Sequence, residues 1–324
     1  MKEITFLQAT NEAVDEEMER DKSTFLMGED VRIWGAPYGD VKGLYQKYPD
    51  RVFDAPISER AILGAAIGAA NMGFRPILHL MYMEFLAVCF SELVNTTVKS
   101  RYMTGGMFKM PITILVYCGA GISAAGQHSD TWNGLFLSVP GLKVVFPSTP
   151  YDLKGLLKSS IREDNIVVFL QHQALLHGDI KSQVPEEDYT IPLGRAEIKK
   201  PGQDVTVVAS GNMVHRALAA AKTAAAKGVN LEVVDLRTVA PLDKDTIIES
   251  VKKTGKLIVL DEEPLTGSVA SEIAGIVAEE AFDYLKAPIK RVCAPDTPVP
   301  FSPPLEKKWI PSEKDLLKAL AEIT

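Results

Sequence analysis

The sequence has few cysteines and no long apolar run. Its three cysteines, Cys89, Cys118 and Cys293, lack CxxC spacing, which argues against a disulfide framework and a zinc site, so we expect three buried thiols. No apolar stretch approaches the ~18 residues that a membrane span needs, and the charged N-terminus MKEITFLQATNEAVDEEMER is unlike a signal peptide. We therefore expect a cytoplasmic protein with no membrane partner.

Clusters of positive charge and the common catalytic motifs are also missing. No run of Lys or Arg is longer than two residues and the net charge is -7, which argues against nucleic acid as a partner. The sequence contains no GxSxG, HExxH, GxxxxGK[ST] or strand-to-helix GxGxxG motif. A protein of this size without its own phosphate loop either binds something uncharged or completes its site with a partner.

The chain is long enough for two domains, and its composition, 46% hydrophobic and 24% charged, is that of a folded globular protein. In the first half, continuous apolar runs predict central parallel strands, and helical patterns that could cover both faces of the sheet lie between them. The predicted strands are 112–117, 142–148 and 165–171, and the predicted helices are 8–20, 59–73, 84–103 and 150–162. The fold class is therefore α/β, with a doubly wound parallel sheet first.

The second half has the same alternation over a shorter length, which predicts a second, smaller α/β domain. Its predicted strands are 204–210, 230–236, 256–263 and 289–295, and its predicted helices are 212–228, 243–253 and 267–286. A polar stretch with three prolines, 183–203, predicts a surface linker, so we place the domains at 1–187 and 188–324. The proline-rich tail 298–315 predicts an extended segment before a last helix at 312–322.

Two local patterns are candidates for function. In FDAPISERAILGAAIG, Ser58 is a plausible N-cap and Glu59 opens a helix whose small residues allow close packing of another element, either from a neighbouring subunit or from the same domain. An interaction with the helix dipole alone would account for Glu59. In the glycine-rich loop 119–130, His128 is a candidate acid or base at the carboxyl end of a predicted strand, or an ordinary polar surface residue.

Six motifs occur together in one order: FDAPISER, GFRPILHLMYMEF, RYMTGG, AAGQHS, VPGLKVVFPSTPYDLKGLL and VVDLRTVAPLD. With these motifs the chain resembles the beta subunit of the dehydrogenase component of 2-oxo acid dehydrogenase complexes, including the pyruvate and acetoin members. The resemblance implies a transketolase-like pyrimidine-binding domain followed by a transketolase C-terminal-like domain.

The resemblance also implies a function and partners. With an alpha subunit, in an α2β2 heterotetramer that contains a second beta chain, the family decarboxylates a 2-oxo acid or cleaves acetoin and transfers the acyl group to a lipoyl acyltransferase core. Such an oxidoreductase shares thiamine diphosphate between its two subunits, and the alpha subunit holds the diphosphate through magnesium. This division of the site would explain why the present chain lacks a phosphate loop.

The resemblance also assigns roles to residues of this chain that stand in the matching motifs. The resemblance implies that Glu59 shares a proton with a ring nitrogen of the aminopyrimidine, and that Met81 and Phe85, otherwise core residues, line the pyrimidine pocket. His128 would serve proton transfer or the incoming lipoyl group. The resemblance further implies a potassium ion bound mainly through backbone oxygens, at Ile112, Ser160, Ile161, Glu163 and Asn165.

Three positions depart from the pattern of many relatives. Leu115 replaces an arginine, Gln171 a glutamate and His79 an acidic residue. We hypothesise that Leu115 and Gln171 replace an ion pair together, which requires them to lie within ~10 Å of each other. Two other readings stay open: the carboxyl-terminal half of a split transketolase, which the QHS loop and VPGLKVV disfavour, and a structural subunit without catalysis, which Glu59 and His128 disfavour. The sequence leaves the substrate undecided.

Overall fold

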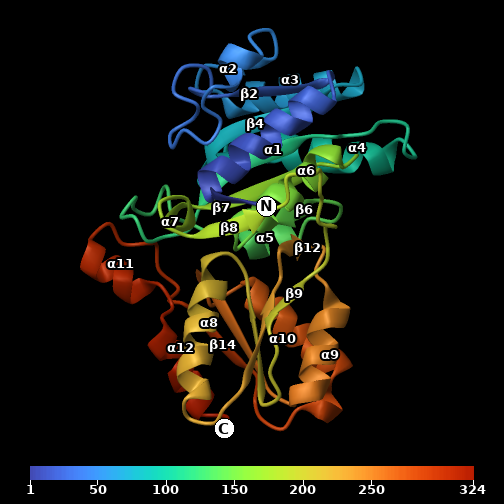
Figure 1. The fold of residues 1–324 in the computed structure, drawn as a ribbon. Helices are drawn as coiled ribbons and strands as arrows, with labels where there is room; N and C mark the ends of the chain where they lie inside the picture. Colours follow the sequence, from blue (N-terminus) through green and yellow to red (C-terminus); the bar gives the residue numbers. More distant parts are fainter. The chain divides into compact units, whose positions relative to one another are not determined.

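The computed structural model describes residues 1–324, and the chain divides into two compact units (Figure 1). One unit contains Met1–Cys118 and Val139–Leu193, and the other contains Gly119–Ser138 and Gly194–Thr324. These units differ in two places from the predicted segments 1–187 and 188–324. The chain passes from one unit to the other after Leu193, and the segment Gly119–Ser138 belongs to the second unit although it lies within the first in sequence.

The first unit is built on a parallel sheet with strand order β6-β7-β5-β4-β2-β3. Every residue of β5 and β7 is buried, as the continuous apolar runs predicted. The strands are β2 (Thr24–Gly28), β3 (Val52–Asp54), β4 (Arg75–Tyr82), β5 (Thr113–Cys118), β6 (Lys143–Val145) and β7 (Val167–His172). A separate antiparallel pair is formed by β1 (Lys2–Thr5) and β8 (Lys181–Val184).

Helices cover both faces of this sheet, which confirms the doubly wound prediction. On one face α1 and α6 pack against each other and against alternate strand residues such as Ile77 and Leu115, while α3 packs on β4. The helices are α1 (Phe6–Arg20), α2 (Leu44–Lys47), α3 (Glu59–Asn71), α4 (Val98–Met103), α6 (Pro150–Arg162) and α7 (Gln173–Leu176). The predicted helix 84–103 is wrong as one α-helix: it consists of a 3₁₀ turn η1 (Met83–Ala87), a π-helical segment η2 (Glu92–Thr97) and α4.

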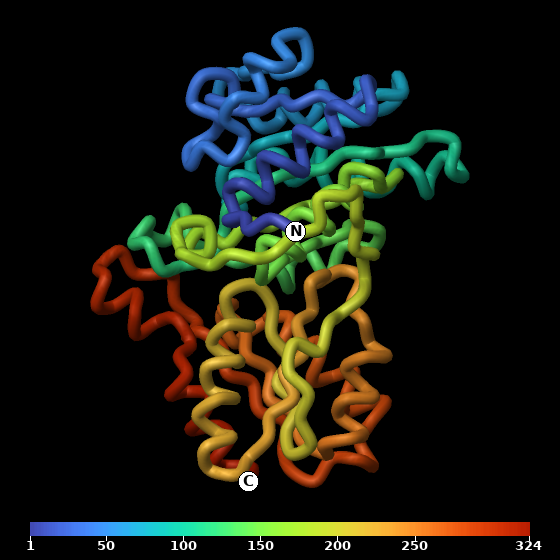
Figure 2. Tube along the Cα trace, in the orientation of Figure 1, coloured from blue at the N-terminus to red at the C-terminus, as the bar shows by residue number.

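The second unit has a five-stranded sheet with order β14-β13-β10-β11-β9, in which only β9 is antiparallel to its neighbour. Its strands are β9 (Glu197–Lys200), β10 (Val205–Ala209), β11 (Leu231–Asp235), β13 (Leu257–Pro264) and β14 (Lys290–Ala294), with a short strand β12 (Thr238–Ala240). Its helices are α5 (Asn133–Leu137), α8 (Asn212–Ala225), α9 (Lys244–Thr254), α10 (Val269–Glu280), η3 (Phe282–Tyr284), α11 (Pro303–Trp309) and α12 (Glu313–Ala321). Helices α8 and α12 lie side by side (Figure 2), and the second α/β domain is confirmed.

Three smaller predictions were wrong. The stretch 183–203 does contain the passage between the two units, after Leu193, but it is not only a linker, because it includes the end of β8 and all of β9, strands whose few buried residues give no apolar run. The proline-rich tail contains α11, because Pro303 and Pro304 occupy its first positions, where a missing backbone N–H costs nothing. Cys293 is partly exposed on β14, at the edge of the sheet. No helix combines the length and apolarity that crossing a bilayer requires.

Candidate active site

Glu59 is the first residue of α3, at the carboxyl end of the β3 strand and its loop. Its side chain is buried, with 6% exposure, whereas its neighbour Arg60 is exposed and pairs with Glu92 at 2.8 Å. Ser58 occupies the N-cap position as predicted, but its side chain makes no capping hydrogen bond. The start of α3 therefore presents a buried carboxyl group close to unpaired backbone N–H groups, which favour negative charge.

Glu29, which the sequence reasoning missed, lies near Glu59. It follows β2 directly, is 4% exposed, and its Oε1 atom accepts no hydrogen bond. Burial raises the pKa of Glu29 above its ordinary value, and the charge of Glu59 raises it further. Burial also raises the pKa of the Cys89 thiol to about 12, with a contribution from Glu59. A signal was available, since Glu29 is the residue that leaves a buried parallel strand at its carboxyl end.

Met81 lies near the carboxyl end of β4 and Phe85 in the η1 turn that follows it, and both are half-buried. Met81 has a φ of 55°, in the left-handed region that costs a non-glycine residue energy, and its N–H donates to Nδ1 of His79 at 3.3 Å. Phe85 contacts Tyr82 edge to face, with ring centroids 5.6 Å apart. A strained backbone at the end of a strand beside an aromatic pair is typical of a ligand site.

Two of the residues that differ from the pattern of many relatives, His79 and Gln171, lie around one buried carboxylate, that of Asp40. The carboxylate accepts hydrogen bonds from Tyr117 Oη at 2.6 Å and Gln171 Nε2 at 3.0 Å, and it lies 3.3 Å from His79 Nε2. Burial opposes ionisation of Asp40, but the electrostatic interaction with His79 and these hydrogen bonds outweigh burial and hold its pKa below the ordinary value. Sequence reasoning did not find Asp40, which lies far from its partners along the chain.

Leu115, the third residue that differs from the pattern of many relatives, is paired with His79 between β4 and β5. It is also paired with Phe169, two residues before Gln171 on β7, so Leu115 and Gln171 point to the same face. Strand geometry puts such neighbours roughly 8 Å apart, within the distance that the pair hypothesis requires.

His128 belongs to the second unit and is half-buried, and its N–H donates to Ala125 O at 3.3 Å. Its segment is held by carboxylates of the same unit: Glu262 accepts from Ala120 N at 2.6 Å, and Glu263 accepts from Gly134 N at 2.8 Å. Glu59, Met81 and Phe85 lie in the first unit, so the chain divides the predicted residues between its two units.

The five predicted potassium residues lie at the carboxyl end of α6 and at the starts of β5 and β7. The carbonyl oxygens of Ile161 and Glu163 converge, because Nη1 of Arg75 donates to both, at 3.2 and 3.0 Å. The Ile112 carbonyl accepts from Val167 N at 2.9 Å, and the Ser160 carbonyl from Glu163 N at 3.2 Å. The Asn165 side chain accepts from Arg101 Nη1 at 3.0 Å. Converging carbonyl oxygens suit a cation, and at present they hold the Arg75 guanidinium.

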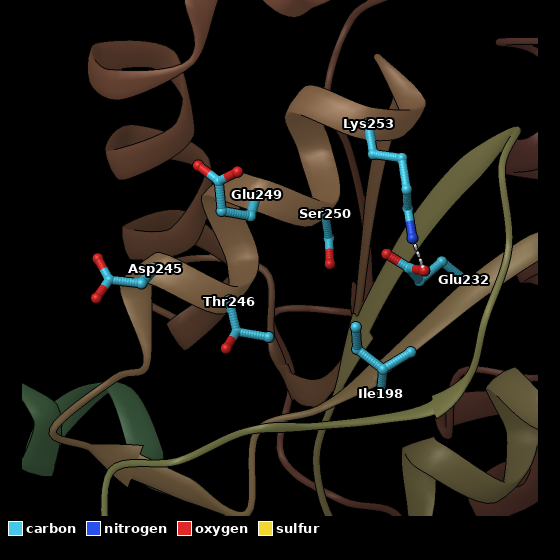
Figure 3. Close-up of a pocket in the computed structure, with 7 residues that line it drawn as sticks. All are labelled: Ile198, Glu232, Asp245, Thr246, Glu249, Ser250 and Lys253. Carbon is cyan, nitrogen blue, oxygen red and sulfur yellow. Dashed lines mark hydrogen bonds and ion pairs between the residues drawn. The ribbon is translucent and has the colours of Figure 1, made fainter.

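A pocket of about 390 Å³ in the second unit involves none of these residues. It is lined by Ile198, Glu232, Asp245, Thr246, Glu249, Ser250 and Lys253 (Figure 3). The fully buried Glu232 pairs there with Lys253, and Glu232 also accepts from Gly202 N at 3.3 Å. The carboxylates of the pocket come mainly from one face of α9, and no histidine or cysteine lines it.

Two segments of the chain match known domain families. Residues 2–178 match the family model of the transketolase pyrimidine-binding domain, and residues 194–316 match that of the transketolase C-terminal domain. The structure also resembles a split-gene transketolase solved as an inactive beta4 tetramer, with a TM-score of 0.81, 23% identity and coverage of 99% of this chain and 98% of that chain. At that identity the likeness concerns the fold alone.

Relatives define the family within this class. The chain is 48% identical to the acetoin:2,6-dichlorophenolindophenol oxidoreductase subunit beta of Cupriavidus necator, over 98% of this chain and 96% of the relative. It is 44% identical to the subunit of that name from Bacillus subtilis, over 99% and 97%. It is 40% identical to the pyruvate dehydrogenase E1 component subunit beta of B. subtilis, over 100% and 99%. The chain belongs to this family of dehydrogenase beta subunits, which work with an alpha subunit and with thiamine diphosphate.

Proposed function

We propose that this chain is the beta subunit of a thiamine-diphosphate-dependent dehydrogenase that cleaves acetoin, and that Glu59 is the residue through which it activates the cofactor. The observation that carries the proposal is the buried position of Glu59 at the start of α3, in a domain of the pyrimidine-binding family. A buried carboxyl group can hold a proton against a ring nitrogen of an aminopyrimidine with little competition from water.

The residues assigned to the pyrimidine site suit such a ring. Glu29 adds a second buried carboxyl group with an oxygen that makes no hydrogen bond, and its raised pKa favours the protonated form. Met81 and Phe85 supply apolar surface against which an aromatic ring would rest. When bound, thiamine diphosphate supplies a carbon acid that becomes a nucleophile towards the carbonyl carbon of the substrate. The part played by this chain is to bind the pyrimidine and to hold the proton at Glu59.

His128 would act as a proton donor or acceptor, or would receive the lipoyl group of the acyltransferase core. The alpha subunit would hold the diphosphate through magnesium, since the described chain contains no cluster of acidic, histidine or cysteine side chains suited to a metal ion. A potassium ion at the converging carbonyls of Ile161 and Glu163, in place of the Arg75 guanidinium that donates to both, is a further part of the proposal.

Acetoin is preferred as substrate because the two acetoin relatives share 48% and 44% of their residues with this chain, against 40% for the pyruvate and 2-oxoisovalerate relatives. Cleavage of pyruvate or another 2-oxo acid is the second candidate, supported by those latter relatives over the full chain. Both substrates present a carbonyl carbon to the same cofactor, so the two reactions differ in the residues that contact the substrate.

The experiment compares Glu59→Gln with the unmodified chain, each assembled with its alpha subunit. Glutamine keeps the shape of the side chain but cannot share an acidic proton, so we expect turnover of acetoin to fall roughly 10²- to 10⁴-fold. Dichlorophenolindophenol reduction reports the rate, and the melting temperature reports folding. The matched control is Glu92→Gln, which weakens the partly exposed pair with Arg60 nearby and should leave the rate unchanged.

Full activity of the Glu59→Gln enzyme would remove Glu59 from its proposed role. The substrate is decided separately, by comparing kcat/KM for acetoin, pyruvate and 2-oxoisovalerate with the unmodified enzyme. A higher value for either oxo acid would replace acetoin as the proposed substrate without affecting the role of Glu59.

A further inference from the structure

Glu306, on the first turn of α11, is bound to the backbone of the loop that carries His128. Its Oε1 accepts from Gly121 N at 2.7 Å and from Ser123 N at 3.1 Å, and its Oε2 accepts from Ser123 N at 3.0 Å and from Ser123 Oγ at 3.0 Å. The side chain is 3% exposed. Glu306 and the loop lie in the same unit, the second, but about 180 positions apart in sequence, so only the fold brings them together.

The geometry of the loop makes it a receptor for an anion. Gly121 has a φ of 120° and Ser123 a φ of 59°, and this turn conformation aims two nearby N–H groups at one point. Such concave arrangements of N–H groups bind carboxylates and phosphates. Here the occupant comes from the chain itself, and a carboxylate that receives several charge-assisted hydrogen bonds in a buried place is held strongly.

The Glu306 carboxylate also helps the loop to keep an unfavourable backbone conformation. Ser123 and Ala125 both adopt left-handed backbone conformations, with φ of 59° and 65°, which cost a non-glycine residue roughly 1–3 kcal/mol each. Residues in such conformations keep them only where the surroundings fix the backbone. Ala125 in turn accepts a hydrogen bond from the N–H of His128, so the position of the histidine depends on the conformation of residues 121–125.

We propose that Glu306 is a positioning residue for His128: by binding the N–H groups of Gly121 and Ser123 it fixes the strained loop and thereby the place of the imidazole. The inference rests on the proposed function, which gives His128 its catalytic part. It assigns a catalytic consequence to α11, a helix in the proline-rich tail that is remote from His128 in sequence.

The test uses the complete enzyme, assembled with its alpha subunit, and a double-mutant cycle of Glu306→Gln and His128→Ala. Glutamine has one acceptor oxygen and places an N–H₂ group against the N–H groups of the loop, so the loop should lose its fixed conformation. We expect kcat for acylation of a lipoyl domain to fall roughly 10- to 100-fold in Glu306→Gln, as misplacement of a reacting group does. The Kd for thiamine diphosphate should not change.

The cycle separates positioning from general structure. If Glu306 acts through His128, the double variant should be no slower than His128→Ala alone, whereas independent structural damage would multiply the two losses. Ser123→Gly provides a rescue, because glycine adopts a φ near 59° without cost. We expect Ser123→Gly to restore several-fold activity to Glu306→Gln.

Glu322→Gln is the matched control, since it removes an exposed pair with Lys290 from the end of the same tail and should leave every rate unchanged. Should Glu306→Gln fail to assemble, Glu306→Asp takes its place, with a carboxylate one carbon short of the loop and the same expected non-additivity with His128→Ala.

A normal rate in the Glu306 variants beside a slow His128→Ala would overturn the inference, and so would multiplicative losses in the double variant. A normal rate in His128→Ala would instead overturn the part proposed for His128. The two failures are therefore distinguishable.

Discussion

The carboxylate of Asp40 lies 3.3 Å from Nε2 of His79, and neither side chain is exposed. The other ring nitrogen of His79 accepts the N–H of Met81, so the imidazole carries its proton on Nε2 and donates it to Asp40. A buried carboxylate is thereby connected through one ring to the strained backbone of Met81, which is a proposed pyrimidine contact. His79 therefore has two effects: its interaction with Asp40 stabilises the folded protein, and its hydrogen bond with Met81 fixes the local backbone conformation.

Two substitutions of His79 should separate these properties. In His79→Gln the amide nitrogen can occupy the place of Nε2 and keep the bond to Asp40, but the acceptor for Met81 N is lost. In His79→Asn an acceptor remains near the place of Nδ1, while the shorter side chain cannot reach Asp40. We expect Asn to cost about 1–3 kcal/mol of unfolding free energy, since it leaves Asp40 short of a donor, and Gln to cost much less.

Cofactor binding should show the opposite order. We expect His79→Gln to weaken thiamine diphosphate binding to the assembled enzyme by roughly 5-fold, about 1 kcal/mol, because Met81 is no longer held. His79→Asn should bind nearly normally. Urea unfolding measures the first property and cofactor titration the second. If both variants lose stability and affinity in parallel, the two hydrogen bonds do not have separate effects.

Local signals explain why some elements were predicted correctly from the sequence and others were not. Helix α6 occupies the predicted residues 150–162, because Thr149 caps it through Asp152 N and Pro150 opens it. The segment 84–103 has a helical pattern, yet a change of hydrogen-bond spacing at the π-helical η2 breaks it into pieces, and the apolar periodicity does not report that change.

Only those residues of the candidate site that lie in short sequence motifs could be predicted from the sequence. Glu59 and Met81 lie in recognisable local sequence motifs, whereas Asp40 and Glu306 are bound to partners far away in the chain. Gln171 is 131 residues from Asp40, and Ser123 is 183 residues from Glu306. Composition and periodicity contain no information about such pairs, because only the crossover connections of the sheet and the docking of the tail bring them together.

Helix α3 has an exposed face of small residues that should be an interface with another subunit. A Cβ atom added to Gly64 or Gly68 would have nothing within 4 Å, so nothing in the described chain covers these positions. Leucine at position 68 should therefore stabilise the isolated chain, by roughly 0.7 kcal/mol, through its better helix propensity. In the heterotetramer the same side chain should prevent close packing, so we expect assembly to weaken at least 10-fold.

The control for Gly68→Leu is Gly275→Leu in α10, which also lies in a helix with open space around it. Both variants should melt at a slightly higher temperature as isolated chains, and only Gly68→Leu should fail to co-purify with the alpha subunit. Sedimentation velocity at several concentrations measures the assembly. Equal assembly of the two variants would place the subunit interface away from this face of α3.

Potassium should stabilise the first unit through the carbonyl oxygens near the end of α6. If the ion binds at Ile161 and Glu163, raising KCl to well above its Kd should add about 1–3 kcal/mol, or roughly 2–4 °C in melting temperature per kcal/mol. NaCl at the same ionic strength controls for screening. Equal melting temperatures in the two salts would remove potassium from the proposal, with no consequence for Glu59 or the cofactor.

Three successive acidic residues at the end of β13 should give the chain a distinctive pH dependence of stability. Asp261, Glu262 and Glu263 are all buried. Burial raises the pKa of Asp261 to about 6, and the nearby Glu262 adds to the shift. Burial and the charge of Asp261 raise the pKa of Glu263 well above its ordinary value. The folded state therefore binds a proton more tightly here than the unfolded state does.

Because the folded pKa is raised, the stabilisation from Asp261 is complete below the unfolded pKa, near 3.8, and is lost as the pH rises through about 6. The shift corresponds to about 3 kcal/mol of unfolding free energy between these two values. Asp261→Asn cannot titrate, so its free energy of unfolding should fall less steeply between pH 4 and pH 6. The absolute stability of this variant is not diagnostic, since asparagine loses one of the acceptors that bind Glu263 N and Ala270 N.

The measurement is a series of urea unfolding curves at half-unit steps of pH, with Asp283→Asn as the control because Asp283 is an exposed aspartate of the same unit. Asp283→Asn should follow the unmodified chain across the whole range, while Asp261→Asn should diverge from it between pH 4 and pH 6. Parallel curves for all three proteins would mean that Asp261 is ionised throughout, held by its two backbone donors in spite of burial. The divergence, if found, also bears on the loop of His128: Glu263, whose pKa the Asp261 charge raises, accepts the N–H of Gly134 at the far end of that segment.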